Sequence, residues 1–214
     1  HEDAEHFPAN VRDLMAWVSG QPLLTGHPFN GLVAKPQSDT SPEIWMLGTS
    51  DYGAQVAAHF GIPYCFAHFI TDGRGVERAF QIYRDNYQPS ERFPEPIANV
   101  CAWALAAETD EDAERLFSTR AHWKVRRDMG DLRPIQSPDA IKDFNYSEGE
   151  KARIAELRAG AIIGTGETVY EQLSNMAGNY GIDEVVVLTW THDQEDRRDR
   201  EEAGLDLWAY ISRG

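Results

Sequence analysis

The chain has 214 residues, of which 42% are hydrophobic and 26% charged, and its formal net charge is -15 at pH 7. This length suits one domain, or at most two, with a sizeable core. The acidic balance argues against binding to nucleic acid or to anionic membranes, and no apolar run approaches the roughly 20 residues of a membrane-spanning helix. We therefore expect a soluble globular protein that binds neither.

The compartment is indicated by the first residues and by the cysteines. The chain begins His1-Glu2-Asp3, without an initiator Met and without the basic-then-apolar pattern of a signal peptide, so we expect a fragment or a processed product of a larger protein. Cys65 and Cys101 lie inside apolar runs that predict buried strands, and no Cys or His spacing typical of a metal site accompanies them. The interpretation is two reduced core cysteines in a cytoplasmic protein, with no metal.

The first predicted element is an amphipathic helix over residues 8–18. Its apolar residues recur at helical spacing: Val11, Leu14, Met15 and Val18. Pro8 suits the first turn of this helix, and Gly20 lies just beyond its end. Residues 21–42 are rich in Pro, Gly, Ser and Thr and predict a loop that carries a short edge strand at 31–34.

Residues 43–63 predict a strand, a turn, a helix and the approach to a second strand. The turn is Gly48-Thr49-Ser50, between the apolar run 44–47 and an alanine-rich helix that stops at Gly61. Such a turn presents backbone N–H groups at the positive end of the helix dipole, beside the hydroxyls of Thr49 and Ser50. It could hold an anion such as a phosphate. The alternative is that Ser50 or Thr49 merely caps its own helix.

Strands and helices alternate through the rest of the chain. The predicted strands cover 64–70, 99–105, 162–164 and 183–189; the predicted helices cover 76–87, a segment capped by Thr109, 147–159, 167–180 and 197–214. The β-branched run 183–189 is typical of a parallel strand covered on both faces. Residues 123–147 lack a sustained period and predict a long insertion loop, which is functional or mobile.

Alternating strands and helices predict right-handed βαβ units and a parallel sheet. An eight-stranded barrel needs about 250 residues, and four of the predicted strands are strong, which is about half of a barrel. We therefore expect an α/β chain that folds as a single domain over residues 1–214 and forms a half barrel.

A series of stretches, in this order, carries a resemblance that begins near Phe7 and ends near Arg198: 42–50, 57–63, 66–70, 83–90, 108–113, 163–169, 180–185 and 189–198. It resembles the C-terminal part of the bacterial luciferase-like flavin-dependent monooxygenases, which have a (β/α)8 TIM barrel. The resemblance implies that the family's first strands, an active-site His and much of the flavin and substrate pocket precede this segment, so the catalytic residues are not identified here. After Arg198 the sequence departs from the family's leucine-rich closing helix.

The resemblance implies an oxidoreductase that uses reduced FMN, supplied by a separate reductase, and O2 on a small organic substrate. It aligns the flavin phosphate with Gly48, Thr49 and Ser50, in agreement with the anion site expected from the turn. A second group, at the C-terminal end of the next strand, could flank the flavin ring or the substrate: Ala67, His68 and Phe69. The alternative for His68 is a histidine hydrogen-bonded into the barrel rim.

Two further groups are weaker candidates. The residues that end the last strand occupy the same position in a barrel: Thr189, Trp190 and His192. Trp190 could equally be packing. Three cations in or near the long loop could contact an anion when the loop closes, although exposed solubilising charge is the alternative: Lys124, Arg126 and Arg127.

Two alternatives to an enzyme fragment stay open. One is a non-catalytic flavin-binding or structural half barrel that dimerises, because open strand edges and apolar surface must be covered. The other is a deazaflavin-dependent dehydrogenase, since a fold alone does not decide the chemistry. We expect the fragment by itself to be inactive and to form a homo-oligomer.

Overall fold

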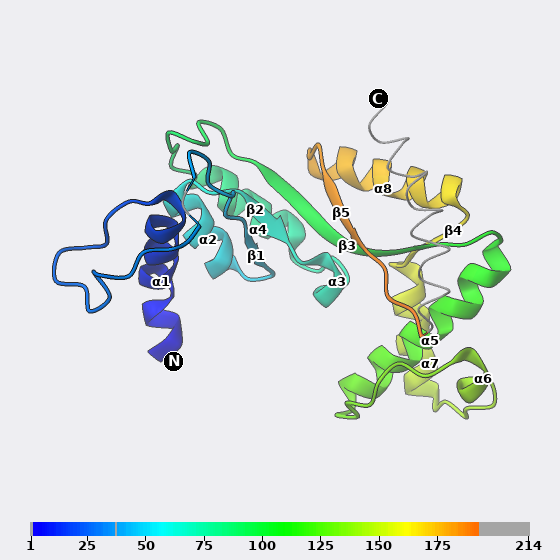
Figure 1. The fold of residues 1–214 in the computed structure, drawn as a ribbon. Helices are drawn as coiled ribbons and strands as arrows, with labels where there is room; N and C mark the ends of the chain where they lie inside the picture. Colours follow the sequence, from blue (N-terminus) through cyan, green and yellow to red (C-terminus); the bar gives the residue numbers. More distant parts are fainter. Residues whose placement is uncertain (1, 37, 193–214) are drawn as a thin grey trace. The chain divides into compact units, whose positions relative to one another are not determined.

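The computed structural model describes residues 2–36 and 38–192 (Figure 1). The chain divides into two compact units. Unit 1 comprises His1–Cys65 and Arg78–Ala98, and unit 2 comprises Phe66–Glu77 and Asn99–Gly214. A division into compact units does not show whether each unit folds by itself. The single domain expected over residues 1–214 therefore stays a prediction. The helix predicted for 197–214 lies outside the described residues.

Unit 1 is built on α1 (Glu2–Ser19), β1 (Met46–Gly48), α2 (Asp51–Phe60), the first residues of β2 (Tyr64–Phe66) and most of α4 (Val76–Asp85). The Met46 N–H donates to the Pro63 carbonyl at 2.9 Å, and the Tyr64 N–H donates to the Ile97 carbonyl at 3.0 Å. The chain before β3 therefore lies beside β2, and β2 lies beside β1.

The core of unit 1 is aromatic. The rings of Tyr64 and Phe80 meet edge to face at 6.2 Å between centroids, and those of Tyr64 and Tyr83 lie 5.5 Å apart. The Tyr83 hydroxyl lies 3.1 Å from the carbonyl oxygens of both Ile62 and Ile97, and its one proton can be donated to either of them. Helix α4 is thereby tied to the chain that enters β2 and to the chain that enters β3.

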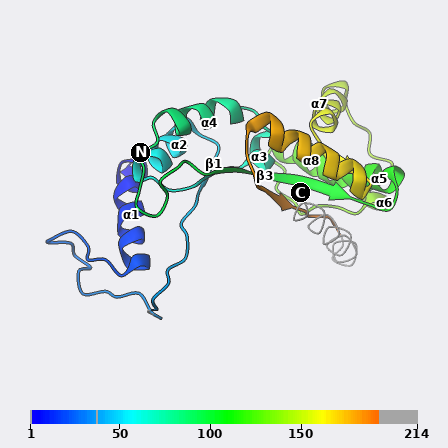
Figure 2. The same cartoon turned by 90° about the horizontal axis from the view of Figure 1, so that it is seen from above.

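Unit 2 holds α3 (His68–Thr71), β3 (Ala98–Ala106), α5 (Asp110–Asp128), α6 (Pro138–Ile141), α7 (Glu148–Ala159), β4 (Ile162–Gly164), α8 (Gly166–Tyr180) and β5 (Val185–Leu188). The last part of β3 pairs in parallel with β4, from Ala104 opposite Ile162. Its earlier part pairs in parallel with β5, from Val100 opposite Val185. Helix α5 packs on α6, α7 and β4, and α8 also packs on β4 (Figures 1 and 2).

The parallel α/β pattern predicted from the sequence is confirmed. The helices expected at 76–87, 147–159 and 167–180 are α4, α7 and α8, and the strands expected at 99–105 and 162–164 are β3 and β4. Local signals explain the agreement: a capping box joins Ser147 and Glu150 at the start of α7, and α8 begins after the Thr165 cap and ends at Gly181 in the left-handed conformation.

Helix α1 begins earlier than predicted, so Pro8 lies inside it rather than in its first turn. The expected edge strand at 31–34 is wrong, because residues 32–34 have no strand pairing, and Leu32 and Val33 are 59% and 58% exposed. The strand expected over 64–70 stops at Phe66. A short helix follows, closed by a bond from the Gly73 N–H to the His68 carbonyl.

Helix α5 runs six residues into the loop predicted for 123–147, and α6 interrupts what remains of that loop. Both ends of the helix suit its dipole: Thr109 caps the first turn, which is acidic, and Arg126 and Arg127 lie in the last turn. Strand β5 was expected to be covered on both faces but is only half-buried. Within the described residues it pairs with β3 alone.

None of the helices in residues 2–36 and 38–192 combines the length and the apolar character needed to cross a bilayer. Cys65 and Cys101 are both buried, as the sequence predicted.

Candidate functional site

The turn between β1 and α2 carries the first candidate site. Ser50 has an extended backbone (φ -102°, ψ 150°), and its Oγ accepts a hydrogen bond from the Gly53 N–H at 3.1 Å. The capping interpretation is therefore confirmed. A hydroxyl that accepts this bond still has its own proton to donate, so capping and anion binding are compatible in Ser50.

Three successive backbone N–H groups in this turn, those of Thr49, Ser50 and Asp51, meet no acceptor in the described part of the chain. A Cβ placed on Gly48 would meet no atom within 4 Å, so the turn is open on that side. Adjacent unpaired amides at the N-terminus of a ten-residue helix are the groups that bind a phosphate.

A basic partner for this turn, which the sequence did not reveal, comes from α4. Arg78 donates through Nε to the Asp51 carboxylate at 2.8 Å, and its Nη2 lies 2.7 Å from the same oxygen. This pair offsets the negative charge that Asp51 brings to the turn. Arg78 follows Asp51 by 27 positions, so no local sequence pattern could have joined them.

The Tyr64 hydroxyl supports the turn from β2, because it donates to the Gly48 carbonyl at 3.2 Å. Burial raises the pKa of Tyr64, so this group stays a protonated donor. The turn is thus held at both ends, by the Ser50 cap and by the Tyr64 hydrogen bond.

The second predicted group lies in unit 2. Ala67 precedes α3 and is fully buried, and His68 is also buried. A Cβ on Gly73 would lie 2.5 Å from the His68 Nε2, so the backbone of Gly73 covers the ring closely. No described residue forms a hydrogen bond with the ring, so the rim hydrogen bond considered for His68 is absent from the described part of the chain. Burial lowers the pKa of His68 and favours a neutral imidazole.

Phe69 and Trp190 meet edge to face, with 6.1 Å between their centroids. Trp190 also contacts the rings of Trp103 and Trp123, and both Phe69 and Trp190 pack against the core around β3 and α5. The packing interpretation of Trp190 is therefore confirmed. The Thr189 hydroxyl donates to the Ala104 carbonyl at 2.7 Å, whereas His192 is exposed.

A buried cluster of charges lies beside α3. The Lys124 Nζ donates to both Asp72 oxygens, at 2.6 and 2.8 Å, and the Asp72 carboxylate also lies 3.5 Å from Nη2 of Arg120 and of Arg153. Lys124 is only 8% exposed, so the interpretation of this residue as solubilising surface charge is wrong. Arg120 is stacked over Trp103 at 4.3 Å.

Neither Asp72 nor Arg120 was a candidate from the sequence. A signal for Arg120 exists, because Ala113, Leu116, Phe117, Arg120 and Lys124 form one stripe of α5 at helical spacing. Burial lowers the pKa of Lys124 and of Arg120, while their contacts with Asp72 oppose that change. Asp72 is the shared counter-ion of this cluster.

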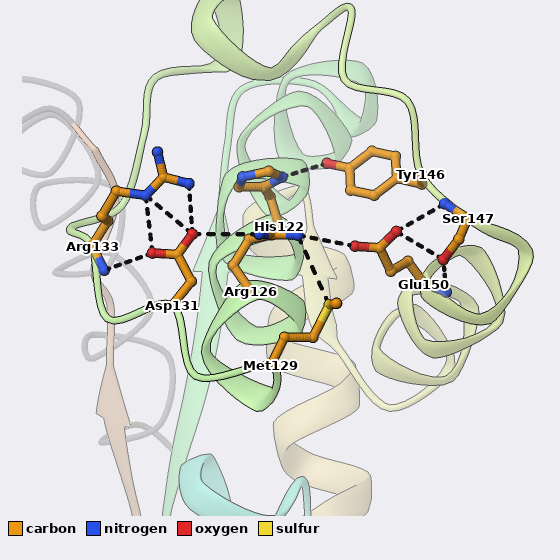
Figure 3. A network of polar contacts seen from close by, with 8 residues as sticks. All are labelled: His122, Arg126, Met129, Asp131, Arg133, Tyr146, Ser147 and Glu150. Carbon is orange, nitrogen blue, oxygen red and sulfur yellow. Dashed lines mark hydrogen bonds and ion pairs between the residues drawn. The ribbon is translucent and has the colours of Figure 1, made fainter.

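Arg126 belongs to a separate network at the end of α5 (Figure 3). Its Nε lies 3.4 Å from an Asp131 oxygen, and its Nη1 donates to Glu150 at 3.3 Å. Arg133 binds the same Asp131 carboxylate and holds the pKa of Asp131 well below its usual range. Arg127 is exposed and lies over the Trp123 ring at 5.1 Å. Internal carboxylates therefore engage Arg126.

In the same view the buried His122 joins α5 to the chain that precedes α7 (Figure 3). Its Nδ1 lies 2.8 Å from the Tyr146 hydroxyl, and the Phe144 ring meets the imidazole at 4.8 Å. Burial lowers the pKa of His122, and the charges of Arg126 and Arg133 lower it further.

Because the pKa of both His68 and His122 is lowered in the fold, we expect the protein to be less stable in mild acid. The unfolded histidines take up a proton near pH 6.5, whereas His68 and His122 resist it in the fold, so the unfolded state binds more protons below that pH. The free energy of unfolding should fall as the pH is lowered from 7.5 to 5.5, measured by urea denaturation. The double variant His68→Gln/His122→Gln should show a smaller difference between the two pH values; an unchanged difference would contradict the assignment.

Within the described residues no group of His, Cys, Asp and Glu is arranged to hold a metal ion. The arrangement therefore offers a turn of unpaired amides at a helix N-terminus in unit 1, and in unit 2 a buried histidine beside a cationic cluster and an aromatic core.

Comparison with known proteins identifies what this chain is similar to. A family model described as luciferase-like monooxygenase matches residues 15–184. The uncharacterized protein YceB of Bacillus subtilis is 37% identical over 202 residues, which are 94% of this chain and 60% of YceB. A luciferase-like monooxygenase of Escherichia coli K12 is 28% identical, over 96% of this chain and 59% of that protein.

Among solved structures, apo-MsnO8 aligns with a TM-score of 0.74 at 26% identity, over 96% of this chain and 61% of MsnO8. The chain therefore spans about 60% of the length of the relatives that it matches.

Proposed function

This chain belongs to the luciferase-like monooxygenase family, and from that premise we propose that it is the part of a flavin-dependent monooxygenase that holds the flavin phosphate. The resemblance seen in the sequence is thereby confirmed, and so is the α/β class with the parallel strands of a TIM barrel. The monooxygenase activity of this protein, its flavin cofactor and its substrate are what we propose.

The observation that carries the proposal is the turn of unpaired amides at Thr49, Ser50 and Asp51. Each N–H can donate to a phosphate oxygen, the Ser50 hydroxyl adds a fourth donor, and the α2 dipole favours the negative charge. Arg78 offsets the Asp51 carboxylate, which would otherwise repel the ligand. The residues present therefore fit the phosphate of FMN.

Bound reduced flavin would supply the electrons that activate O2, and this chain's residues would bind and orient it. Tyr64 keeps the turn in place through the Gly48 carbonyl. We assign Ala67, His68 and Phe69 to the flavin ring or to the substrate, where a neutral His68 would add no charge to an apolar surface.

The same proposal includes a partner enzyme, a location, an assembly state and a class of substrate. A separate reductase would supply the reduced flavin, and the protein would act in the cytoplasm, where buried Cys65 and Cys101 stay reduced. A homo-oligomer would cover open strand edges: among the described residues, β1 pairs only with β2. A small organic molecule is the proposed substrate.

The proposal predicts that the chain binds FMN through its phosphate. We expect saturable quenching of tryptophan fluorescence on titration with FMN, and a Ser50→Ala variant that binds about tenfold more weakly, because a hydrogen bond to a charged group contributes about 1.5–3 kcal/mol. Ser50→Asp keeps a side chain that caps helices but adds a charge that repels phosphate, so it should bind more weakly still.

Two controls isolate the phosphate. Riboflavin lacks that group, so Ser50→Ala should leave the affinity for riboflavin unchanged. Ser174→Ala, on the exposed side of α8, should alter neither affinity. Equal effects of Ser50→Ala on FMN and riboflavin would rule out this turn as the phosphate site.

A further inference from the structure

Unit 1 also has a groove, which we call the α1 groove. It has a volume of about 410 Å³ and lies between the last turns of α1, the segment that enters β1 and the loop that precedes β3. Its wall is mainly apolar: Met15, Val18, Pro42, Ile44, Ile62 and Phe93. Three of these residues, Ile44, Ile62 and Phe93, precede β1, β2 and β3, so the groove lies at the N-terminal ends of the strands. The Gly48-Thr49-Ser50 turn follows the opposite end of β1.

One cation of the groove is fixed in place without a carboxylate partner. Arg92 donates through Nη1 to the Ser41 hydroxyl and the Pro42 carbonyl, both at 3.1 Å, and through Nη2 to the Ser41 carbonyl at 3.0 Å. A guanidinium has five N–H groups, so the Nε–H and one Nη2–H remain. No acidic side chain in the described residues pairs with Arg92.

The other cation that lines the groove, Arg12, does have a carboxylate partner. Arg12 lies 3.5 Å from Asp13, which is also held by His27 at 3.0 Å. Glu91 is the acidic residue that lines the groove, and it is exposed. Arg92 is therefore the cation whose bonds all go to neutral oxygens.

We propose that the α1 groove binds an apolar monocarboxylate, with its hydrocarbon body on the apolar wall and its carboxylate on Arg92. The volume lies in the range of small-molecule sites, about 300–1,000 Å³, and an apolar lining with few polar groups is typical of them. The Nε and Nη2 atoms share one edge of the guanidinium, which suits the two oxygens of a carboxylate. This site is separate from the flavin phosphate turn and does not rest on the proposed activity.

The probe is 4-butylbenzoate, and its neutral isostere 4-butylbenzamide is the matched ligand. Isothermal titration calorimetry should show saturable binding of the benzoate to the whole chain and at least tenfold weaker binding of the benzamide. Arg92→Gln, which keeps hydrogen-bond donors for the Ser41 contact, should weaken the benzoate at least tenfold and leave the benzamide unchanged.

Three more variants complete the test. Arg84→Gln alters an exposed cation outside the groove and should change neither affinity. Glu91→Gln removes the nearby negative charge and should bind the benzoate as tightly as the original chain, or more tightly. Ala16→Phe should fill the groove and abolish the binding of both ligands, with circular dichroism confirming that the variant is folded.

The ratio of the two affinities on one variant is independent of how much of that variant is folded. The proposal is overturned if the benzoate does not bind at millimolar concentration. It is also overturned if the two ligands bind equally or if Arg92→Gln leaves their ratio unchanged, because the groove would then be only an apolar surface.

Discussion

Replacement of Asp72 by Asn is expected to lower the free energy of unfolding by about 3–5 kcal/mol, which is typical when one partner of a buried ion pair is removed. The Asp72 carboxylate is the shared acceptor of Lys124 and Arg120, and both cations are almost fully buried. With a neutral amide in its place, two cations would face each other in the interior of unit 2.

The Asp72→Asn substitution removes the negative charge without changing the size of the side chain. Asp72 has a left-handed backbone (φ 53°), a conformation that Asn also adopts readily, so backbone strain should not change. Chemical denaturation followed by circular dichroism measures the effect. A loss below about 1 kcal/mol would show that the cluster contributes no more than a surface pair.

The matched control is Asp128→Asn, because Asp128 is an exposed partner of Arg153 at 3.2 Å. It should cost about 1 kcal/mol or less. The double variant Asp72→Asn/Lys124→Met should recover part of the stability lost in Asp72→Asn, because Met leaves no uncompensated charge. A double variant that is less stable by the sum of both single effects would argue against direct coupling.

A second large effect is expected from Gly61→Ala, at the C-terminus of α2. Gly61 has a φ of 58°, and a Cβ there would lie 2.3 Å from the Gln88 carbonyl oxygen. The neighbouring chain cannot withdraw freely, because the Gln88 N–H donates to the Ala58 carbonyl and the Ser90 hydroxyl donates to the Gly61 carbonyl. Left-handed strain of about 1–2 kcal/mol and overpacking of about 1–3 kcal/mol together predict a loss of about 2–5 kcal/mol.

Gly20→Ala separates the two contributions. Gly20 also has a positive φ, 71°, but a Cβ there would meet nothing within 4 Å. Its loss should therefore be the strain alone, about 1–2 kcal/mol. Thermal and urea unfolding of both variants measure the difference, and equal losses would mean that the contact with Gln88 relaxes without cost.

The local features of this chain were predictable because they depend on residues a few positions apart. The Ser50 cap, the capping box of Ser147 and Glu150, and the left-handed glycines after α2 and α8 all follow from side chains within one helical turn. The turn of unpaired amides at Thr49, Ser50 and Asp51 belongs to this class, and its geometry agrees with the sequence pattern.

Other predictions were wrong because tertiary contacts overrode the local preference of the sequence. The run 64–70 is apolar enough for a strand, yet a left-handed residue at Asp72 closes a short helix there instead. Exposed charge, the alternative considered for Lys124, is wrong because Lys124 lies on the same stripe of α5 as the buried residues Ala113, Leu116 and Phe117.

By itself, then, the sequence determined the alternation of strands and helices, the family, the caps and the turn that could hold a phosphate, because periodicity and capping act between near neighbours. Only the tertiary structure decided which distant charges meet. Arg78 reaches Asp51 across 27 positions, and Lys124 reaches Asp72 across 52. It also decided that β5 pairs with β3 and that Trp190 packs against the core. These contacts depend on how whole elements pack, and no local pattern in the chain encodes that packing.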